Sequence, residues 1–158
     1  MLALLLTLVS CKKDKTFEYC ELGIVLTDRF ESYDSEGAYD VAYADGDLIV
    51  GISRFSFVDC EQEYGMLTTH SPLKFAQIHL ARYGQNSDIT VAQHGDVPYY
   101  SYSVSDLGGF EYFYMPTFYR TPYAYFVITF ITPYDNVKIQ RDKIFEYIET
   151  VYILEEHI

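Results

Sequence analysis

An aromatic segment at residues 110–132 constrains this chain more than any other feature. Ten of its 23 residues are Phe or Tyr, and Thr121-Pro122 divides it into two long runs. Aromatic and β-branched side chains favour strands, and proline belongs at a turn or a strand start because it removes a donor from the ladder. The segment therefore predicts two long adjacent strands.

Both faces of the second of these strands are apolar. One face carries Phe126, Ile128 and Phe130, and the other carries Tyr125, Val127 and Ile131. A sheet with one wet face would alternate apolar with polar residues. Either layers of structure cover both faces of the sheet, or a partner covers one of them.

The remaining elements follow from turn signals and periodicity. We expect a first strand at 16–26, either continuous or broken at Gly23, and a hairpin at 39–57. A loop at 59–69, strands at 89–93 and 97–104, and a turn at 106–109 follow. The hairpin turns at Asp45-Gly46, since glycine adopts a positive φ without penalty.

Two helices have recognisable start signals. The first begins with Ser71 as N-cap and Pro72 at its first position, and Gly84 ends it. The second begins with Asp135 as N-cap and continues for about 17 residues, as far as Tyr152.

Charge excludes one class of partner. The 158 residues, enough for one domain, include 23 acidic and 11 basic side chains, which gives a net charge of −12. A phosphate backbone repels such a chain, so we expect no nucleic-acid binding. The excess of negative charge has two explanations. It attracts cations or a basic partner, or it only keeps an extracellular protein soluble.

The N-terminal residues carry a targeting signal. Residues 2–9 form an apolar run that is too short to span a bilayer. The tetrapeptide Leu8-Val9-Ser10-Cys11 that ends this run resembles the lipobox of bacterial lipoproteins. The resemblance implies export to the bacterial cell envelope, cleavage before Cys11, and membrane attachment through lipid on that residue.

The lipobox also divides the chain. We expect a signal peptide at residues 1–10, a lipidated tether at 11–16 and a single domain at 17–158. With Cys11 lipidated, Cys20 and Cys60 remain in an oxidising compartment. They either form a disulfide or are two buried free thiols.

The element order resembles the PsbP-like superfamily, which includes the extrinsic photosystem subunit, a Ran-binding nuclear import factor and many bacterial lipoproteins. The matching features are the strand at 17–26, the hairpin at 39–57, the helix from Ser71-Pro72, the strand at 123–132 and the closing helix from Asp135. The resemblance implies an α+β fold in which an antiparallel sheet of about six to seven strands is sandwiched between helices (an α/β/α sandwich). It also implies action through binding or assembly, and it transfers no functional residue.

Motifs for catalysis and metal binding are missing from the sequence. There is no Gly-x-Ser-x-Gly elbow, and the four histidines lack the spacing of zinc ligands. One group of acidic residues consists of Asp40, Asp45 and Asp47, and a second consists of Asp59, Glu61 and Glu63. Neither group matches the pattern of a calcium-binding loop. We expect no catalytic residue, metal site or cofactor, and no enzymatic activity.

The surplus of tyrosine is the remaining signal for function. Exposed tyrosines bind sugars and peptides well, because each offers a flat ring and a hydroxyl at little entropic cost. Tyr112, Tyr114, Tyr123 and Tyr125 are the candidate binding face, unless they pack beneath the two helices. We expect a non-catalytic, lipid-anchored extracytoplasmic protein that binds a partner protein or supports an envelope assembly. The alternative is a lipoprotein that binds a small ligand or glycan on this face.

Overall fold

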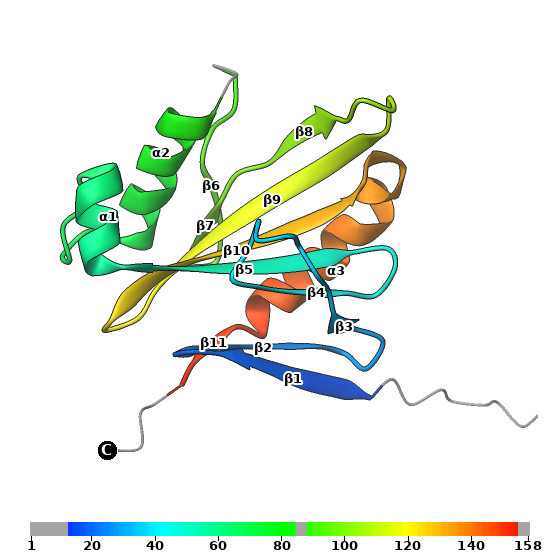
Figure 1. Cartoon of the computed structure of the whole chain (residues 1–158), viewed down its shortest axis with the longest axis horizontal. Helices are drawn as coiled ribbons and strands as arrows, with labels where there is room; N and C mark the ends of the chain where they lie inside the picture. Colours follow the sequence, from blue (N-terminus) through cyan, green and yellow to red (C-terminus); the bar gives the residue numbers. More distant parts are fainter. Residues whose placement is uncertain (1–12, 85–87, 155–158) are drawn as a thin grey trace, which may run out of the picture.

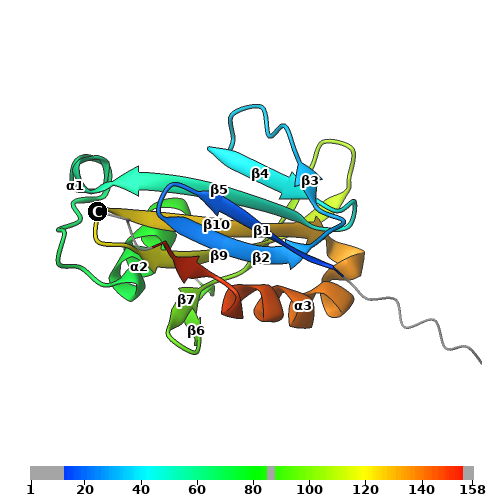
Figure 2. The same cartoon turned by 90° about the horizontal axis from the view of Figure 1, so that it is seen from below.

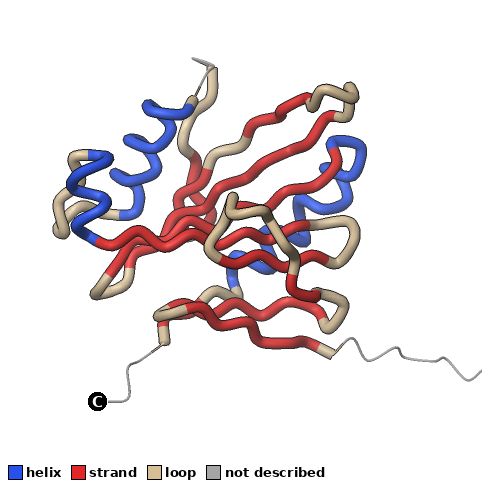
Figure 3. Tube along the Cα trace, viewed as in Figure 1, coloured by secondary structure: helices blue, strands red, loops and turns tan. Residues whose placement is uncertain are grey.

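A large antiparallel sheet forms the centre of the protein (Figures 1 and 3). The computed structural model describes residues 13–84 and 88–154. The sheet has eight strands in the order β3-β4-β5-β10-β9-β7-β6, with β8 also paired to β9. Its strands are β3 (Glu31–Ser32), β4 (Val41–Ala44), β5 (Ile49–Ser56), β6 (Ala92–His94), β7 (Val97–Tyr99), β8 (Tyr102–Ser105), β9 (Glu111–Arg120) and β10 (Ala124–Pro133).

The aromatic segment supplies the two longest strands of this sheet, as predicted. β9 and β10 pair in register from Tyr125 opposite Arg120 to Pro133 opposite Tyr112, and β5 pairs with the other edge of β10. The hydroxyl of Thr121 accepts a hydrogen bond from the amide of Ala124 at 3.0 Å, which closes the predicted turn.

Helices cover both faces of the sheet, so the expected sandwich is confirmed (Figure 2). Helix α3 (Val137–Glu149) packs on one face, with Phe126, Ile128 and Phe130 in its core. Helices α1 (Phe57–Tyr64) and α2 (Pro72–Tyr83) pack on the other face, over Tyr125 and Val127. The apolar character of both faces of β10 therefore reflects two separate cores.

A second, three-stranded sheet completes the α3 side of the molecule. It consists of β1 (Asp14–Tyr19), β2 (Leu22–Thr27) and β11 (Tyr152–Ile153) in the order β1-β2-β11. Gly23 in β2 leaves room for the ring of Tyr152, which a Cβ at position 23 would overlap. The Tyr152 hydroxyl donates to a carboxylate oxygen of Glu18 at 3.0 Å, so the sheet joins segments far apart in the sequence.

The prediction of one strand at 16–26 was wrong, because the chain reverses within it. β1 and β2 form a hairpin whose turn contains Cys20 with a φ of 51°. The left-handed region is unusual for a residue with a side chain, so the sequence held no turn signal here. β1 also begins at Asp14, inside the segment predicted as a tether.

The predicted loop at 59–69 was also wrong in its first half. Ser56 caps α1: its hydroxyl accepts from the Asp59 amide at 3.1 Å and donates to the Asp59 carboxylate at 2.6 Å. The helix ends at Gly65, whose φ is 63°. The helix is short and largely polar, so its capping signals were the clearest indication of it.

The predicted helix from Ser71 is confirmed. The closing helix is also present, but its predicted first and last residues were wrong. Ser71 caps α2 by accepting from the Lys74 amide, and Gly84 follows its last residue. At the other helix, a single 3-10 turn (Tyr134–Asn136) precedes α3, and Asn136 rather than Asp135 occupies the N-cap. The chain leaves α3 after Glu149 because the following residues pair with β2.

The turn signals along the middle of the chain are confirmed. Asp45 and Gly46 connect β4 to β5, with φ of 95° at the glycine. The two strands predicted at 89–93 and 97–104 are present as three shorter ones, β6, β7 and β8, because the chain breaks after Tyr99.

Both described cysteines are free thiols, so the disulfide alternative does not hold in this structure, and the alternative of two buried thiols is correct only for Cys60. Cys20 is exposed in the β1–β2 turn, whereas Cys60 is buried in α1 on the opposite side of the large sheet. Burial raises the pKa of the Cys60 thiol to about 12. Cys11, the predicted lipidation site, lies outside the described residues. None of the described helices is long and apolar enough to span a membrane.

Candidate functional site

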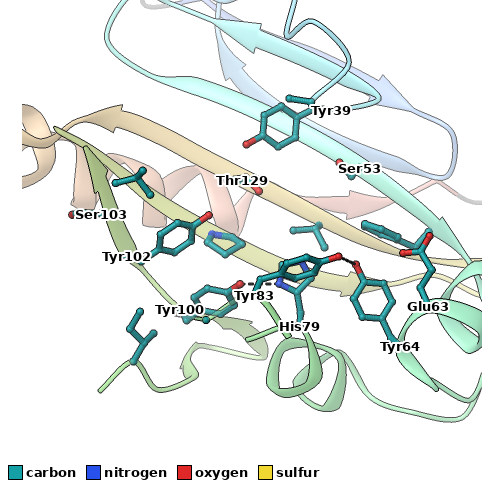
Figure 4. A pocket seen from close by; sticks show the side chains of 17 residues that line it. Tyr39, Ser53, Glu63, Tyr64, His79, Tyr83, Tyr100, Tyr102, Ser103 and Thr129 are labelled. Atoms are coloured by element: carbon teal, nitrogen blue, oxygen red, sulfur yellow. Dashed lines mark hydrogen bonds between the residues drawn. The ribbon is translucent and has the colours of Figure 1, made fainter. Parts of the chain in front are cut away.

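A large pocket lies on the face of the large sheet that α1 and α2 cover only at one end. It has a volume of about 860 Å³. That volume is within the range of pockets that hold small organic ligands. We call this pocket the aromatic groove; Figure 4 shows the side chains that line it.

The groove exists because small side chains form its floor and large ones its walls. The floor comes from the central strands: Ser53 on β5, Val127 and Thr129 on β10, and Pro116 on β9. The walls are aromatic: Tyr39, Phe55, Tyr64, His79, Tyr83, Tyr100 and Tyr102. Since neighbouring strands lie only about 5 Å apart, short residues on adjacent strands leave one continuous hollow.

Tyr39 forms one wall, from the loop before β4. Its ring lies on the backbone of Gly51 in β5, where a Cβ would overlap it. Burial raises the pKa of Tyr39 to about 12, with smaller contributions from Tyr102 and Tyr114, while a hydrogen bond with Thr129 opposes the shift. The Tyr39 side chain lines the groove together with Thr129 and Tyr102 (Figure 4).

Two hydrogen-bonded aromatic pairs form the opposite wall (Figure 4). His79 Nδ1 and the Tyr100 hydroxyl are 2.7 Å apart, which fixes the α2 histidine against the strand side of the groove. The hydroxyls of Tyr64 on α1 and Tyr83 on α2 are 3.4 Å apart. These pairs preorganise the wall without placing a charge in it.

A column of stacked rings supports the β8 end of the groove. The rings of Tyr102 and Tyr114 are nearly parallel, with an angle of 8° and centroids 5.2 Å apart. Tyr100 continues the column between Tyr102, at 6.0 Å, and Phe118, at 5.8 Å. Aromatic contacts of this kind hold ring positions, so the Tyr102 side chain is fixed before any ligand arrives.

The interior of the groove is uncharged near pH 7. Burial, with a smaller contribution from Arg82, lowers the pKa of His79 to about 4, so its imidazole is neutral. Burial raises the pKa of both Tyr100 and Tyr102, so their hydroxyls stay protonated. Glu63 is exposed at the rim.

Arg82 does not supply a positive charge to the interior. Its guanidinium donates to the carbonyl of Glu63 and lies 5.0 Å from the ring centroid of Tyr64 and 5.7 Å from that of Tyr83. These contacts hold the side chain against the outside of the wall. The groove therefore presents hydroxyls and ring surfaces to a ligand.

The structure separates the four tyrosines that the sequence grouped as a binding face. Tyr125 is buried beneath α1 and α2, and its hydroxyl donates to the carbonyls of Leu67 at 2.9 Å and His70 at 2.7 Å. Tyr123 lies in the β9–β10 turn, at 48% exposure. Tyr112 lines a different hollow, and Tyr114 borders the aromatic groove through its stack with Tyr102.

That second hollow has a volume of about 350 Å³ and lies between the β8–β9 turn and the end of β10. We call it the hairpin notch; Phe110, Tyr112, Pro133 and Tyr134 line it, together with Glu111 and Asp135. Phe110 is 68% exposed, and Leu107 in the same turn is fully exposed.

Sequence reasoning missed several residues of the groove. Tyr39 was placed only as a strand residue, His79 only as one of four scattered histidines, and Tyr64 within a loop. Gly51 was the one available signal, because a glycine inside a strand marks a close approach by another group. Among the described residues, no three His, Cys, Asp or Glu side chains are arranged to hold a metal ion.

Several solved structures resemble this fold, and two of them illustrate the similarity. The chain superposes on a Bacteroides thetaiotaomicron crystal structure with a TM-score of 0.57 and 15% identity, over 87% of this chain and 46% of that one. It superposes on the solution structure of cyanobacterial PsbP (CyanoP) from Synechocystis with a TM-score of 0.51 and 12% identity, over 92% of this chain and 95% of that one. The chain thus spans about half the length of the Bacteroides protein.

Comparison by sequence found no matching family model and no curated relative. The structural similarity to PsbP extends over nearly the full length of both chains, and it agrees with the element order expected from the sequence. The chain therefore has the PsbP-like fold.

Proposed function

We propose that this is a non-catalytic protein of the bacterial cell envelope that binds a small organic ligand in the aromatic groove. The observation that carries the proposal is the preformed hollow over the central strands. Its floor is made of short side chains and its walls are held by stacking and hydrogen bonds. Preformed, concave sites of this size lose little freedom on binding, which favours affinity.

The protonation states in the groove favour binding over acid–base catalysis. A general acid or base works best with a pKa near the working pH. Burial moves the pKa values of His79 and Tyr39 away from neutrality, to about 4 and about 12. Neither group then exchanges a proton readily near pH 7.

Filling the floor of the groove is the direct test. Ser53→Phe places a ring in the hollow from β5, and we expect it to abolish ligand binding in a thermal-shift screen of a metabolite library. A true ligand at 100 times its Kd adds about 2.7 kcal/mol of stability, which raises the melting temperature of the wild type by about 5–10 °C.

Ser105→Phe is the matched control, because Ser105 is exposed on β8 and does not line the groove. Compounds that stabilise the wild type and Ser105→Phe but not Ser53→Phe support the proposal. A screen whose hits stabilise all three proteins equally would place binding elsewhere and contradict it.

We propose further that lipid on Cys11 holds the protein on the membrane. The lipobox-like tetrapeptide supports this, and the first strand, β1, begins three residues after Cys11, at Asp14. Cells grown with labelled palmitate should incorporate label into the wild type and not into Cys11→Ala. Cys20→Ala is the control and should keep its label; labelling that survives Cys11→Ala would rule out the anchor.

A protein partner is the second candidate function, and the hairpin notch favours it. Phe110, Leu107 and Tyr134 expose large apolar side chains together at one end of the sheet. Exposed apolar groups gathered at one place mark interaction sites more often than scattered ones do. Glu111 and Asp135 beside them suit a partner with basic side chains.

The notch can be tested by photocrosslinking in intact envelopes. A photoreactive amino acid at position 110 should give one dominant crosslinked protein, and the crosslink should be lost in Tyr134→Asp. The same amino acid at position 58 should not give that product, because the exposed Val58 lies on α1, beside the start of β10, whereas the notch lies at the end of that strand. Equal crosslinking from both positions would contradict a partner site at the notch.

A further inference from the structure

The chemistry of the aromatic groove restricts the class of ligand that it takes. The first restriction is charge. His79 is neutral, Arg82 is held against Glu63 and the tyrosine rings outside, and Glu63 is exposed at the rim. A charged ligand would lose hydration in the interior and gain no opposite charge there. The groove therefore suits an uncharged molecule.

The second restriction comes from the hydroxyl groups on the groove surface. Ser53 and Thr129 on the floor, and Tyr39, Tyr64, Tyr83, Tyr100 and Tyr102 on the walls, all carry one. Each hydroxyl both donates and accepts hydrogen bonds. Tyr100 already bonds to His79, and Tyr64 bonds to Tyr83, so the hydrogen-bonding capacity that these pairs leave unused belongs mainly to the other hydroxyls. An apolar ligand would displace water from those hydroxyls without replacing its hydrogen bonds, which costs affinity. The ligand must therefore carry several groups that also donate and accept.

The third restriction is the arrangement of hydroxyls around Tyr39. Tyr39 lines the groove together with Thr129 on β10 and Tyr102 on β8, so hydroxyls from three separate segments face the same hollow (Figure 4). The ring of Tyr39 is seated on Gly51. A rigid ring holding a hydroxyl in a fixed place selects ligands by the positions of their own hydroxyls.

From these three features we infer that the ligand is a neutral saccharide, a mono- or short oligosaccharide with free ring hydroxyls. The inference rests on the proposed ligand-binding function and names its ligand class. The sugar's hydroxyls exchange hydrogen bonds with those of Tyr39, Tyr102 and Thr129, and its C–H surfaces contact the aromatic walls. Tyr39 is a specificity-determining residue in this arrangement, and Gly51 positions it.

Calorimetric titration with a defined panel tests the inference. The panel contains short neutral oligosaccharides of glucose, xylose, mannose and galactose, an oligogalacturonate as the anionic counterpart, an oligomer of glucosamine as the cationic one, and indole as an apolar ring. We expect binding of at least one neutral oligosaccharide and weaker or no binding of the other three classes.

Variants that remove one hydroxyl locate the binding. Tyr39→Phe and Tyr102→Phe should each raise the Kd for the bound saccharide about five-fold, the usual effect of one lost hydrogen bond. Gly51→Ala should raise it at least as much, because it displaces the Tyr39 ring. Tyr112→Phe, outside the groove, should leave the Kd unchanged.

The outcomes separate this inference from the proposed function. If only charged or apolar compounds bind, the inference of a neutral saccharide ligand is wrong, and the proposed ligand-binding function still stands. The saccharide inference is also wrong, and the ligand-binding function still stands, if the metabolite screen yields a compound that is not a saccharide and whose binding is lost in Ser53→Phe. Saccharide binding that is unchanged in Tyr39→Phe, Tyr102→Phe and Ser53→Phe contradicts both, because it takes place outside the groove.

Discussion

Replacing Phe75 by alanine is expected to lower the free energy of unfolding by about 4 kcal/mol. Phe75 of α2 is fully buried at the centre of the core between the helices and the sheet. Five aromatic rings surround it at centroid distances of 5.2 to 5.9 Å, those of Phe55, Tyr64, His79, Phe118 and Tyr125. Alanine would leave a cavity that these rigid rings cannot close.

Thermal and urea unfolding measure this effect. A loss of about 4 kcal/mol in a domain of this size lowers the melting temperature by about 10 °C. Phe110→Ala is the control, because Phe110 is largely exposed and its removal should change stability by no more than about 0.5 kcal/mol. A loss below about 1 kcal/mol for Phe75→Ala would mean that the helices are not packed on the sheet as described.

Acidification is expected to destabilise the protein through His79 by about 3 kcal/mol. Burial lowers the pKa of His79 from its ordinary value of 6.5 to about 4 in the folded state. The unfolded chain therefore takes up a proton near pH 6.5, whereas the folded protein takes it up only near pH 4. The free energy of unfolding falls as the pH is lowered through this window, and the contribution of His79 is constant below it.

Comparing the wild type with His79→Gln isolates this contribution. Glutamine keeps a polar group beside the Tyr100 hydroxyl and does not titrate. Carboxylates that titrate in the same range affect both proteins, so the difference between the two pH profiles reports His79. We expect that difference to change by about 3 kcal/mol between pH 7 and pH 4. A difference that is constant with pH would show that position 79 is not buried as a neutral histidine.

Local signals in the sequence predicted those elements whose boundaries are set by their own residues. Asp45-Gly46 requires only a glycine at positive φ, and Ser71 and Pro72 mark a helix start without reference to the rest of the fold. The two-sided apolar pattern of β10 also predicted its covering layers correctly. These features carry their structural reason within a few neighbouring positions.

Two of the failures occurred where a distant contact determines the local structure, whereas α1 was missed although its caps at Ser56 and Gly65 are local. The β1–β2 hairpin turns at Cys20, a residue with no preference for positive φ, and β2 is fixed by its pairing with β11. The closing helix ends early for the same reason, because Thr150 accepts a hydrogen bond from the amide of Val25. The secondary-structure propensity of a short stretch of residues gives no information about these long-range contacts.

The groove was beyond sequence reasoning because it is a property of the strand register. Ser53, Thr129 and Pro116 form one hollow only because β5, β10 and β9 are neighbours in the sheet. A count of tyrosines does not distinguish Tyr125, whose hydroxyl bonds to backbone carbonyls, from Tyr39, whose hydroxyl faces the groove.

The pairing of β2 with β11 also dictates the order in which the domain can be completed. Tyr152 and Glu18 bond to each other across 134 positions of the sequence. A chain that emerges from a ribosome or a translocation pore releases the β1–β2 hairpin early and its third strand late. An isolated hairpin is only marginally stable. The three-stranded sheet is therefore complete only when Ile153, the last residue of β11 that pairs with β2, has been synthesised.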